Sequence, residues 1–177
     1  MSKPIVIWPE KVLNTPTKPV KEFGAALEPL LNDLYEAVRA AQGIGIAANQ
    51  IGVPLRVALV GRRDGTFFEI VNPKIVERSG KVTYHEGCLS VPDAWEQVDR
   101  AERVRVRWQD RRGDQREEEA EGKLAHVFQH EIDHLDGTIY LMHLSPLKRT
   151  MIRERMERMK REIKEDPSRY PYPITRE

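Results

Sequence analysis

The stretch QHEIDHLDG, Gln129–Gly137, carries two histidines four residues apart with a glutamate directly after the first. It closes a longer segment, residues 123–135, whose apolar residues recur at helical spacing until a glycine ends the pattern. Residues four apart lie on one face of a helix, so His130 and His134 can offer two ring nitrogens to one metal ion. Glu131 would then lie where a general base for a water molecule is needed.

This short motif can also arise by chance in a chain that binds no metal. The histidines lie on the flank of an apolar stripe formed by Leu124, Val127, Phe128, Ile132 and Leu135, and therefore at the edge of the core. Exposed surface histidines would lie opposite this stripe, and packed core histidines would lie within it. His126 extends the series, but eight residues advance a helix by about 12 Å, too far for His126 and His134 to share an ion. If His126 and His130 were the ligands, Val127 would lie in the position that Glu131 otherwise takes, and valine cannot accept a proton. We therefore assign His126 to a pocket wall or to the surface.

The charges of the chain nearly cancel. Its 177 residues include 29 Lys and Arg against 28 Asp and Glu, which gives no global argument for direct DNA binding or for a membrane partner. Residues 1–20 lack the apolar centre of a secretory signal, and no stretch approaches the roughly 20 apolar residues of a membrane span. We expect a cytoplasmic protein with one domain over residues 1–165 and a Pro-rich tail over residues 166–177.

Other segments show helix and strand patterns. Apolar spacing predicts a helix over residues 25–42 and an amphipathic helix over residues 147–165. Between them, residues 55–60 and 66–71 are typical of strands, and residues 104–108 alternate apolar side chains with arginines. Strands grouped between helices predict an α+β fold. The tail has three prolines and little to bury, so we expect it to be extended or disordered.

The single cysteine, Cys88, lies in the strand-like segment EGCLSVP at residues 86–92. A lone thiol in a reducing compartment is an inert core residue, a metal ligand or a nucleophile. A catalytic metal normally has three protein ligands and one position for water. Cys88 is therefore the candidate for the third ligand beside the two histidines.

Three segments resemble the signature segments of the peptide deformylases, namely GIGIAANQ at 43–50, EGCLS at 86–90 and QHEIDHLDG at 129–137. They occur in the family's order and spacing, and LSPLK at 144–148 is similar to the sequence that follows the family's metal helix. The resemblance implies hydrolytic removal of the formyl group from the N-terminal formylmethionine of newly made proteins, with release of formate. With the predicted elements, it implies an α+β fold in which antiparallel or mixed sheets pack around the metal-binding helix, with a helix at the C-terminal end.

The resemblance also implies roles for single residues. The metal ion would have three protein ligands, Cys88, His130 and His134. Glu131 would take a proton from metal-bound water and later protonate the departing amine. The side chain of Gln50 and the backbone N–H of Leu89 would stabilise the oxyanion. The family is associated with ferrous iron, whereas one thiolate and two imidazoles equally suit zinc, nickel or cobalt.

The glycine-rich segment GIGIAANQIG lacks the lysine of a phosphate loop, but its small residues leave room for a peptide backbone. The resemblance implies that the backbone near Ile44, Gly45 and Gly87 holds the substrate as an added strand, and that an apolar pocket takes the methionine side chain. Two positions depart from the family pattern. Trp95 stands where relatives often have arginine, and His126 stands where an aliphatic side chain commonly lines the pocket. Both would alter peptide preference and leave the reaction class intact.

Residues 148–165 hold eight basic and four acidic side chains, a local excess that the whole chain lacks. The C-terminal helix docks at the ribosome in better-studied relatives, so we expect salt-sensitive contacts with RNA phosphates here. The alternative is a helix packed on its own domain or on a second copy, with its charges merely solvated.

Asp133, in the histidine segment, is either a surface charge or a partner for Arg100 that steadies the metal site.

Two other functions are open at this level. A general zinc peptidase would also contain His-Glu-x-x-His, but it makes no use of EGCLS and needs a further ligand downstream. A ribosome- or partner-binding protein with a structural metal site would usually need a fourth protein ligand. The motifs provide three ligands, and this number favours the deformylase.

Overall fold

The computed structural model describes residues 2–170 and 172–175, and this part of the chain contains three α-helices and seven β-strands. The helices are α1 (Glu28–Ala40), α2 (Gly122–Leu135) and α3 (Pro146–Glu165). The strands are β1 (Gly45–Ala47), β2 (Val57–Gly61), β3 (Phe67–Ser79), β4 (Val82–Cys88), β5 (Val91–Arg100), β6 (Arg103–Gln109) and β7 (Gln115–Glu121). Five short 3-10 helices lie at Lys11–Asn14, Gly24–Ala26, Ala48–Ile51, Tyr140–His143 and Pro167–Arg169.

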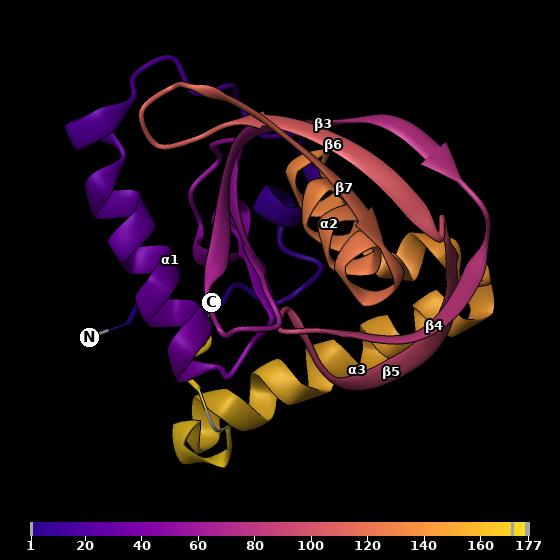
Figure 1. Ribbon diagram of the computed structural model, residues 1–177. Helices are drawn as coiled ribbons and strands as arrows, with labels where there is room; N and C mark the ends of the chain where they lie inside the picture. Colours follow the sequence, from indigo (N-terminus) through magenta and orange to yellow (C-terminus); the bar gives the residue numbers. More distant parts are fainter. Residues whose placement is uncertain (1, 171, 176–177) are drawn as a thin grey trace.

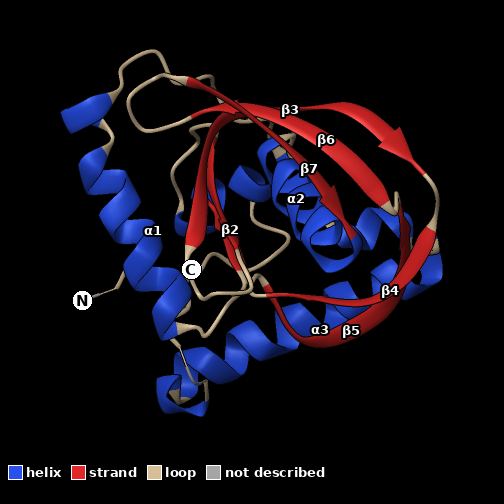
Figure 2. Ribbon diagram, in the orientation of Figure 1, coloured by secondary structure: helices blue, strands red, loops and turns tan. Residues whose placement is uncertain are grey.

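Five strands form a curved antiparallel sheet in the order β1-β2-β3-β6-β7, and α2 lies inside its curve (Figure 1). The strands β4 and β5 pair with each other in a separate antiparallel hairpin, and α3 packs against β5 (Figure 2). The expected α+β fold, with sheets around the histidine helix and a helix at the C-terminal end, is confirmed. Within the described ranges, every helix is too short or too polar to cross a lipid bilayer.

Aromatic side chains join α2 to the large sheet. Phe128 of α2 packs against Trp108 of β6 and Phe68 of β3, with ring centroids 5.7 and 5.5 Å apart. Val104 and Val106 are buried on the same side of β6. Because successive strand residues point to opposite faces, this burial follows the alternation in the sequence, and the predicted strand and its inward face are confirmed.

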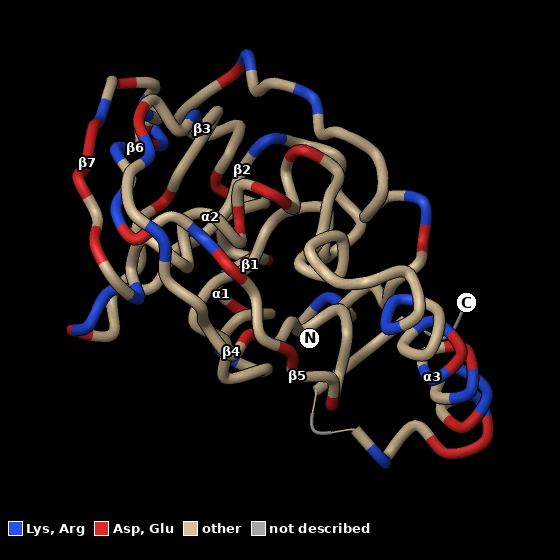
Figure 3. Tube along the Cα trace, turned by 90° about the vertical axis from the view of Figure 1, so that its right-hand side faces the viewer, with Lys and Arg blue, Asp and Glu red and all other residues tan. Residues whose placement is uncertain are grey.

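The outward arginines of β6 form ion pairs along the sheet. Arg107 binds Glu117 of β7 at 2.9 Å, and Arg105 binds Glu77 of β3 at 2.6 Å. Figure 3 shows basic residues along β6 and acidic residues along the neighbouring β7. The pairs are exposed, so each contributes little to stability, roughly 0–1 kcal/mol.

A second core holds the two other helices. The predicted apolar stripe of α3 is buried; it consists of Ile152, Met156, Met159 and Ile163. In α1, Leu31, Leu34 and Val38 of the predicted spacing are buried too. Ser145 caps α3 by accepting a hydrogen bond from the backbone N–H of Lys148, and Pro146 occupies the first turn. Both helices predicted by apolar spacing are confirmed, within a few residues of their expected ends.

The end of α2 depends on a glycine. Gly137 has φ of +76°, a left-handed conformation in which a side chain is strained. A Cβ atom there would also lie 2.6 Å from backbone atoms of Thr15 and Pro16. Gly137 thus lets the N-terminal segment pack tightly against the helix that carries the histidines.

The tail differs from expectation. Its residue Ile174 is only 8% exposed and forms a parallel bridge with Ile5, and Tyr172 packs against the core. Two tyrosines and an isoleucine supply buried surface, so the expectation that the tail has little to bury is wrong. Residues 171, 176 and 177 of the expected tail lie outside the described residues.

Candidate metal centre and active site

The structure brings together the three side chains that were predicted as metal ligands. Cys88 ends β4, whereas His130 and His134 lie on consecutive turns of α2. Cys88 Sγ lies 3.3 Å from His134 Nε2, which in turn lies 3.2 Å from His130 Nε2. Ligand atoms on one tetrahedral ion, at bond lengths of about 2.1–2.3 Å, lie roughly 3.5 Å apart. The sulfur and the two nitrogens therefore fit a single transition-metal ion.

The surroundings of these atoms also fit a cation. Burial raises the pKa of the Cys88 thiol and lowers the pKa of His134, while the backbone N–H groups of Ser90 and Val91 point toward the sulfur. Without a cation, burial thus opposes the thiolate. A divalent ion would reverse that preference, because it binds the deprotonated sulfur and the neutral imidazole.

Glu86 of β4 orients His130. The Nδ1 atom of His130 hydrogen-bonds to the Glu86 carboxylate, which leaves Nε2 to face the ligand cluster. Arg100 donates to both carboxylate oxygens at 2.7 and 2.8 Å and also binds Asp133 at 2.8 Å. Burial alone would raise the pKa of Glu86, but the bonds from Arg100, His126 and His130 outweigh it and hold that pKa well below the usual range. Asp133 is therefore a partner of Arg100, as one of the two alternatives predicted.

A second cluster of possible ligands overlaps the first. Glu86, His126 and His130 also place donor atoms within 4.8 Å of one another. Both oxygens of Glu86 are already bonded to Arg100, and His130 uses only its Nδ1 atom there. We therefore assign this cluster to the support of His130 rather than to a second ion.

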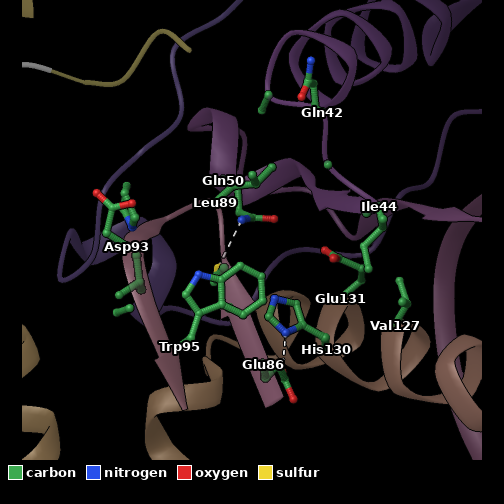
Figure 4. Close-up of a pocket in the computed structure, with 18 of the residues that line it drawn as sticks. Gln42, Ile44, Gln50, Glu86, Leu89, Asp93, Trp95, Val127, His130 and Glu131 are labelled. Carbon is green, nitrogen blue, oxygen red and sulfur yellow. Dashed lines mark hydrogen bonds and ion pairs between the residues drawn. The ribbon is translucent and has the colours of Figure 1, made fainter. Parts of the chain in front are cut away.

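Glu131 projects from α2 beside the ligands. The residue is buried, and its Oε2 atom has no hydrogen-bond partner among the residues that the structure describes. Figure 4 shows its carboxylate pointing into the pocket, near Ile44. Burial raises the pKa of Glu131 well above its ordinary value, and the charge of Glu86 adds to this effect. A carboxyl group with a raised pKa holds its proton more firmly than an exposed one, which suits a group that must carry a proton to a leaving amine.

Gln50 is held with its amide group toward the cysteine. Its Oε1 atom accepts a hydrogen bond of 2.9 Å from the backbone N–H of Ala47. Its Nε2 atom donates to Ser90 Oγ at 3.2 Å and lies 3.6 Å from Cys88 Sγ (Figure 4). Leu89 lies in the two-residue turn between β4 and β5. Two donors, one on a side chain and one on the backbone, therefore lie next to the ligand cluster.

A sequence model of the polypeptide deformylase family matches residues 2–150. The chain belongs to this family. It is 42% identical to the peptide deformylase of Acidobacterium capsulatum over 168 residues, which cover 91% of this chain and 97% of that relative. The resemblance found in the sequence is thereby confirmed.

Solved deformylases have the same fold. The crystal structure of a peptide deformylase from Legionella pneumophila superposes with a TM-score of 0.87 at 41% identity, covering 97% of this chain and 100% of that chain. The enzyme from Ehrlichia chaffeensis in complex with actinonin gives a TM-score of 0.87 at 37% identity, covering 91% of this chain and 99% of that one.

In this deformylase, a pocket of about 760 Å³ opens beside the ligand cluster. Its lining includes all five residues that were predicted to bind substrate: Ile44, Gly45, Gly87, Trp95 and His126. Lining residues come from the edge of the large sheet, from the β4–β5 hairpin, from α2 and from the tail. The structure therefore gathers the predicted substrate residues around one opening.

The two residues that depart from the family pattern form part of the pocket wall. The indole of Trp95 is 63% exposed and lies over Gly87, where a Cβ atom would come within 2.9 Å of the ring. His126 is 8% exposed, and its Nε2 atom lies 2.9 Å from Glu86 while its ring stacks on Tyr84 at 4.5 Å. Of the two assignments left open for His126, the structure places the residue in the pocket wall.

Sequence reasoning missed three residues near the site. Glu86 lies two positions before the predicted cysteine ligand, within the same signature segment EGCLS, so a signal for it existed. Ser90 binds Gln50, and Tyr172 binds the backbone of Leu89. No local pattern points to either of these contacts.

Proposed function

We propose that this deformylase removes the formyl group from N-formylmethionine at the start of newly synthesised proteins in the cytoplasm. Water adds to the formyl carbon, the C–N bond breaks, and formate and a free amine result. Family membership supports the reaction class. The observation that carries the proposal is the convergence of the sulfur of Cys88 and the Nε2 atoms of His130 and His134 beside the buried Glu131 carboxyl, whose Oε2 atom has no hydrogen-bond partner in the described part of the chain.

The three converging residues would hold one divalent ion. When bound, the ion would polarise the formyl oxygen and lower the pKa of water in the site. We propose ferrous iron as the native ion, because the family is associated with it. Zinc, nickel and cobalt accept the same donors.

Side-chain and backbone groups of the protein would carry out the remaining steps. Glu131 takes a proton from the attacking water while the new C–O bond forms. The side-chain amide of Gln50 and the backbone N–H of Leu89 donate hydrogen bonds to the oxyanion that develops. As the C–N bond breaks, Glu131 returns the proton to the nitrogen. The position of the Glu131 carboxyl, buried beside the ligand cluster, suits this shuttle, because one group can reach both the water and the leaving nitrogen.

The pocket would select the substrate. We propose that the backbone of Ile44, Gly45 and Gly87 pairs with an extended peptide beside β1. The methionine side chain would lie against His126, and the residues after it against Trp95. A formyl carbon carries only hydrogen, so a narrow site can admit it and exclude ordinary peptide bonds.

Release of formate tests this function. The purified protein with its metal should release formate from formyl-Met-Ala-Ser, and Glu131→Gln should lose at least a hundredfold in kcat with its metal content unchanged. Glu119→Gln, an exposed residue of β7, is the matched control and should keep wild-type activity. Cleavage of internal peptide bonds without formate release would instead support a general zinc peptidase.

The basic surface of α3 supports a ribosomal location. Arg158 and Arg161 are exposed, and the apolar face of the helix is buried, so these charges are available to RNA phosphates. Arg158→Glu with Arg161→Glu should weaken salt-dependent pelleting with ribosomes. The control changes Arg62 and Arg63, exposed at the β2–β3 turn, to glutamate. Equal pelleting of both double variants would remove the ribosomal part of the proposal.

A further inference from the structure

The tail reaches the active site by a path that the sequence did not indicate. Its backbone pairs with the N-terminal segment: Ile5 donates to Pro173 at 2.8 Å, and Thr175 donates to Ile5 at 2.9 Å. The buried side chain of Ile174 anchors this contact in the core. From there Tyr172 extends back to the pocket and forms part of its lining.

Tyr172 binds the turn that directly follows Cys88. Its hydroxyl donates a hydrogen bond of 3.0 Å to the carbonyl oxygen of Leu89. Burial raises the pKa of Tyr172, so the hydroxyl remains protonated and able to donate. Leu89 follows Cys88 directly, and it supplies the proposed backbone donor for the oxyanion. One side chain of the tail is therefore bonded to the turn that holds this donor and directly follows a proposed metal ligand.

The N-terminal segment relays a second contact from the tail. The residue next to Ile5, Val6, donates to the backbone oxygen of Gln50 at 2.8 Å. Trp8 donates to the backbone oxygen of Ser90 at 3.0 Å. Hydrogen bonds thus link the tail to the N-terminal segment. Further bonds link the N-terminal segment to the two segments that bear the proposed oxyanion donors.

We propose that the tail is a positioning element of the active site, and that Tyr172 aligns the Leu89 turn for stabilisation of the oxyanion. This inference rests on the proposed function. Alignment of a donor matters most where charge develops, so the loss of Tyr172's hydroxyl should affect turnover more than substrate binding.

Tyr172→Phe tests the inference with little change in packing. We expect kcat for formyl-Met-Ala-Ser to fall about three- to tenfold, with KM and metal content within twofold of wild type. We also expect the backbone amides of residues 88–91 to exchange hydrogen faster, as measured by mass spectrometry.

A chain that ends at Arg169 should lose at least as much kcat. Tyr35→Phe is the matched control, because it removes a hydroxyl that binds Glu69 at 2.9 Å, and neither residue lines the pocket.

The outcomes separate this inference from the proposed function. Wild-type protein that releases no formate would overturn the function, while faster amide exchange in Tyr172→Phe would still support the alignment of the turn. If Tyr172→Phe matches wild type in both kcat and amide exchange, the inference is wrong. It is equally wrong if Tyr35→Phe shows the same loss of kcat, because the effect would then be one of general stability.

Discussion

Gly45 lies so close to Glu131 that a Cβ atom on residue 45 would come within 2.5 Å of Glu131 Oε1. Residue 45 lies on β1 and Glu131 on α2, so the contact fixes how near the sheet edge comes to the proposed proton acceptor. Only glycine leaves room for the carboxyl group in its observed position.

Gly45→Ala should therefore displace the carboxyl group of Glu131. A shift of about 1 Å at a catalytic group can cost on the order of a hundredfold in rate, so we expect kcat to fall by about that factor. Steady-state kinetics on a formyl-Met peptide checks this, with metal analysis to show that the ion is retained. A variant with unchanged kcat would mean that the position of Glu131 does not limit the reaction.

Arg100→Lys should weaken metal binding. Lysine cannot donate two bonds to Glu86 in the planar arrangement of arginine, so the carboxylate would hold His130 less firmly. We expect metal affinity to fall about 10–100-fold, measured by competition with a chelator. Arg107→Lys, which alters an exposed pair with Glu117, should leave the affinity unchanged. Equal losses in both variants would contradict a specific role for Arg100.

Removal of the metal should abolish activity and lower stability. The proposed ligands lie on β4 and α2, so a bound ion links two separate elements of the folded chain and stabilises it by mass action. We expect the Tm to fall by about 10 °C on chelation and to recover when the ion is returned. In Cys88→Ala the chelator should change Tm much less. A chelator that shifts both proteins alike would argue that Cys88 is not a ligand.

His126→Leu should change substrate preference. The imidazole gives the pocket wall a polar edge bonded to Glu86, whereas leucine would make that wall apolar. We expect the ratio of kcat/KM for formyl-Met over formyl-Met sulfoxide peptides to rise about tenfold. Lys123→Leu, at an exposed residue of the same pocket, tests whether any added apolar side chain has this effect. An unchanged ratio in His126→Leu would mean that the methionine side chain does not contact residue 126.

Some of this structure follows from local patterns. The apolar spacing of α2 and the alternation along β6 describe elements with one buried face, and such elements repeat with the period of their own geometry. The paired histidines of α2 share a face for the same reason. Local chemistry was therefore enough to predict the helix, its two proposed ligands and the proposed proton acceptor between them.

Other features depend on contacts between distant segments. The sequence QREEEAE of β7 has no apolar alternation, and it forms a strand because its residues pair with β6 along the whole strand. The approach of Cys88 to the histidines is also non-local; the lone thiol made Cys88 a candidate for the third ligand, and the resemblance to a family supported that role. The docking of Tyr172 depends on the N-terminal segment, at the opposite end of the chain.

The two edges of the large sheet differ in how readily another strand could pair with them. At β7 the outer backbone groups stand among the exposed carboxylates of Glu117, Glu119 and Glu121, and these repel a second sheet and hinder fibril-like growth. At β1 the three residues Gly45–Ala47 carry no charge. The proposed pairing of a substrate strand with β1 would therefore leave the β7 edge guarded against polymerisation.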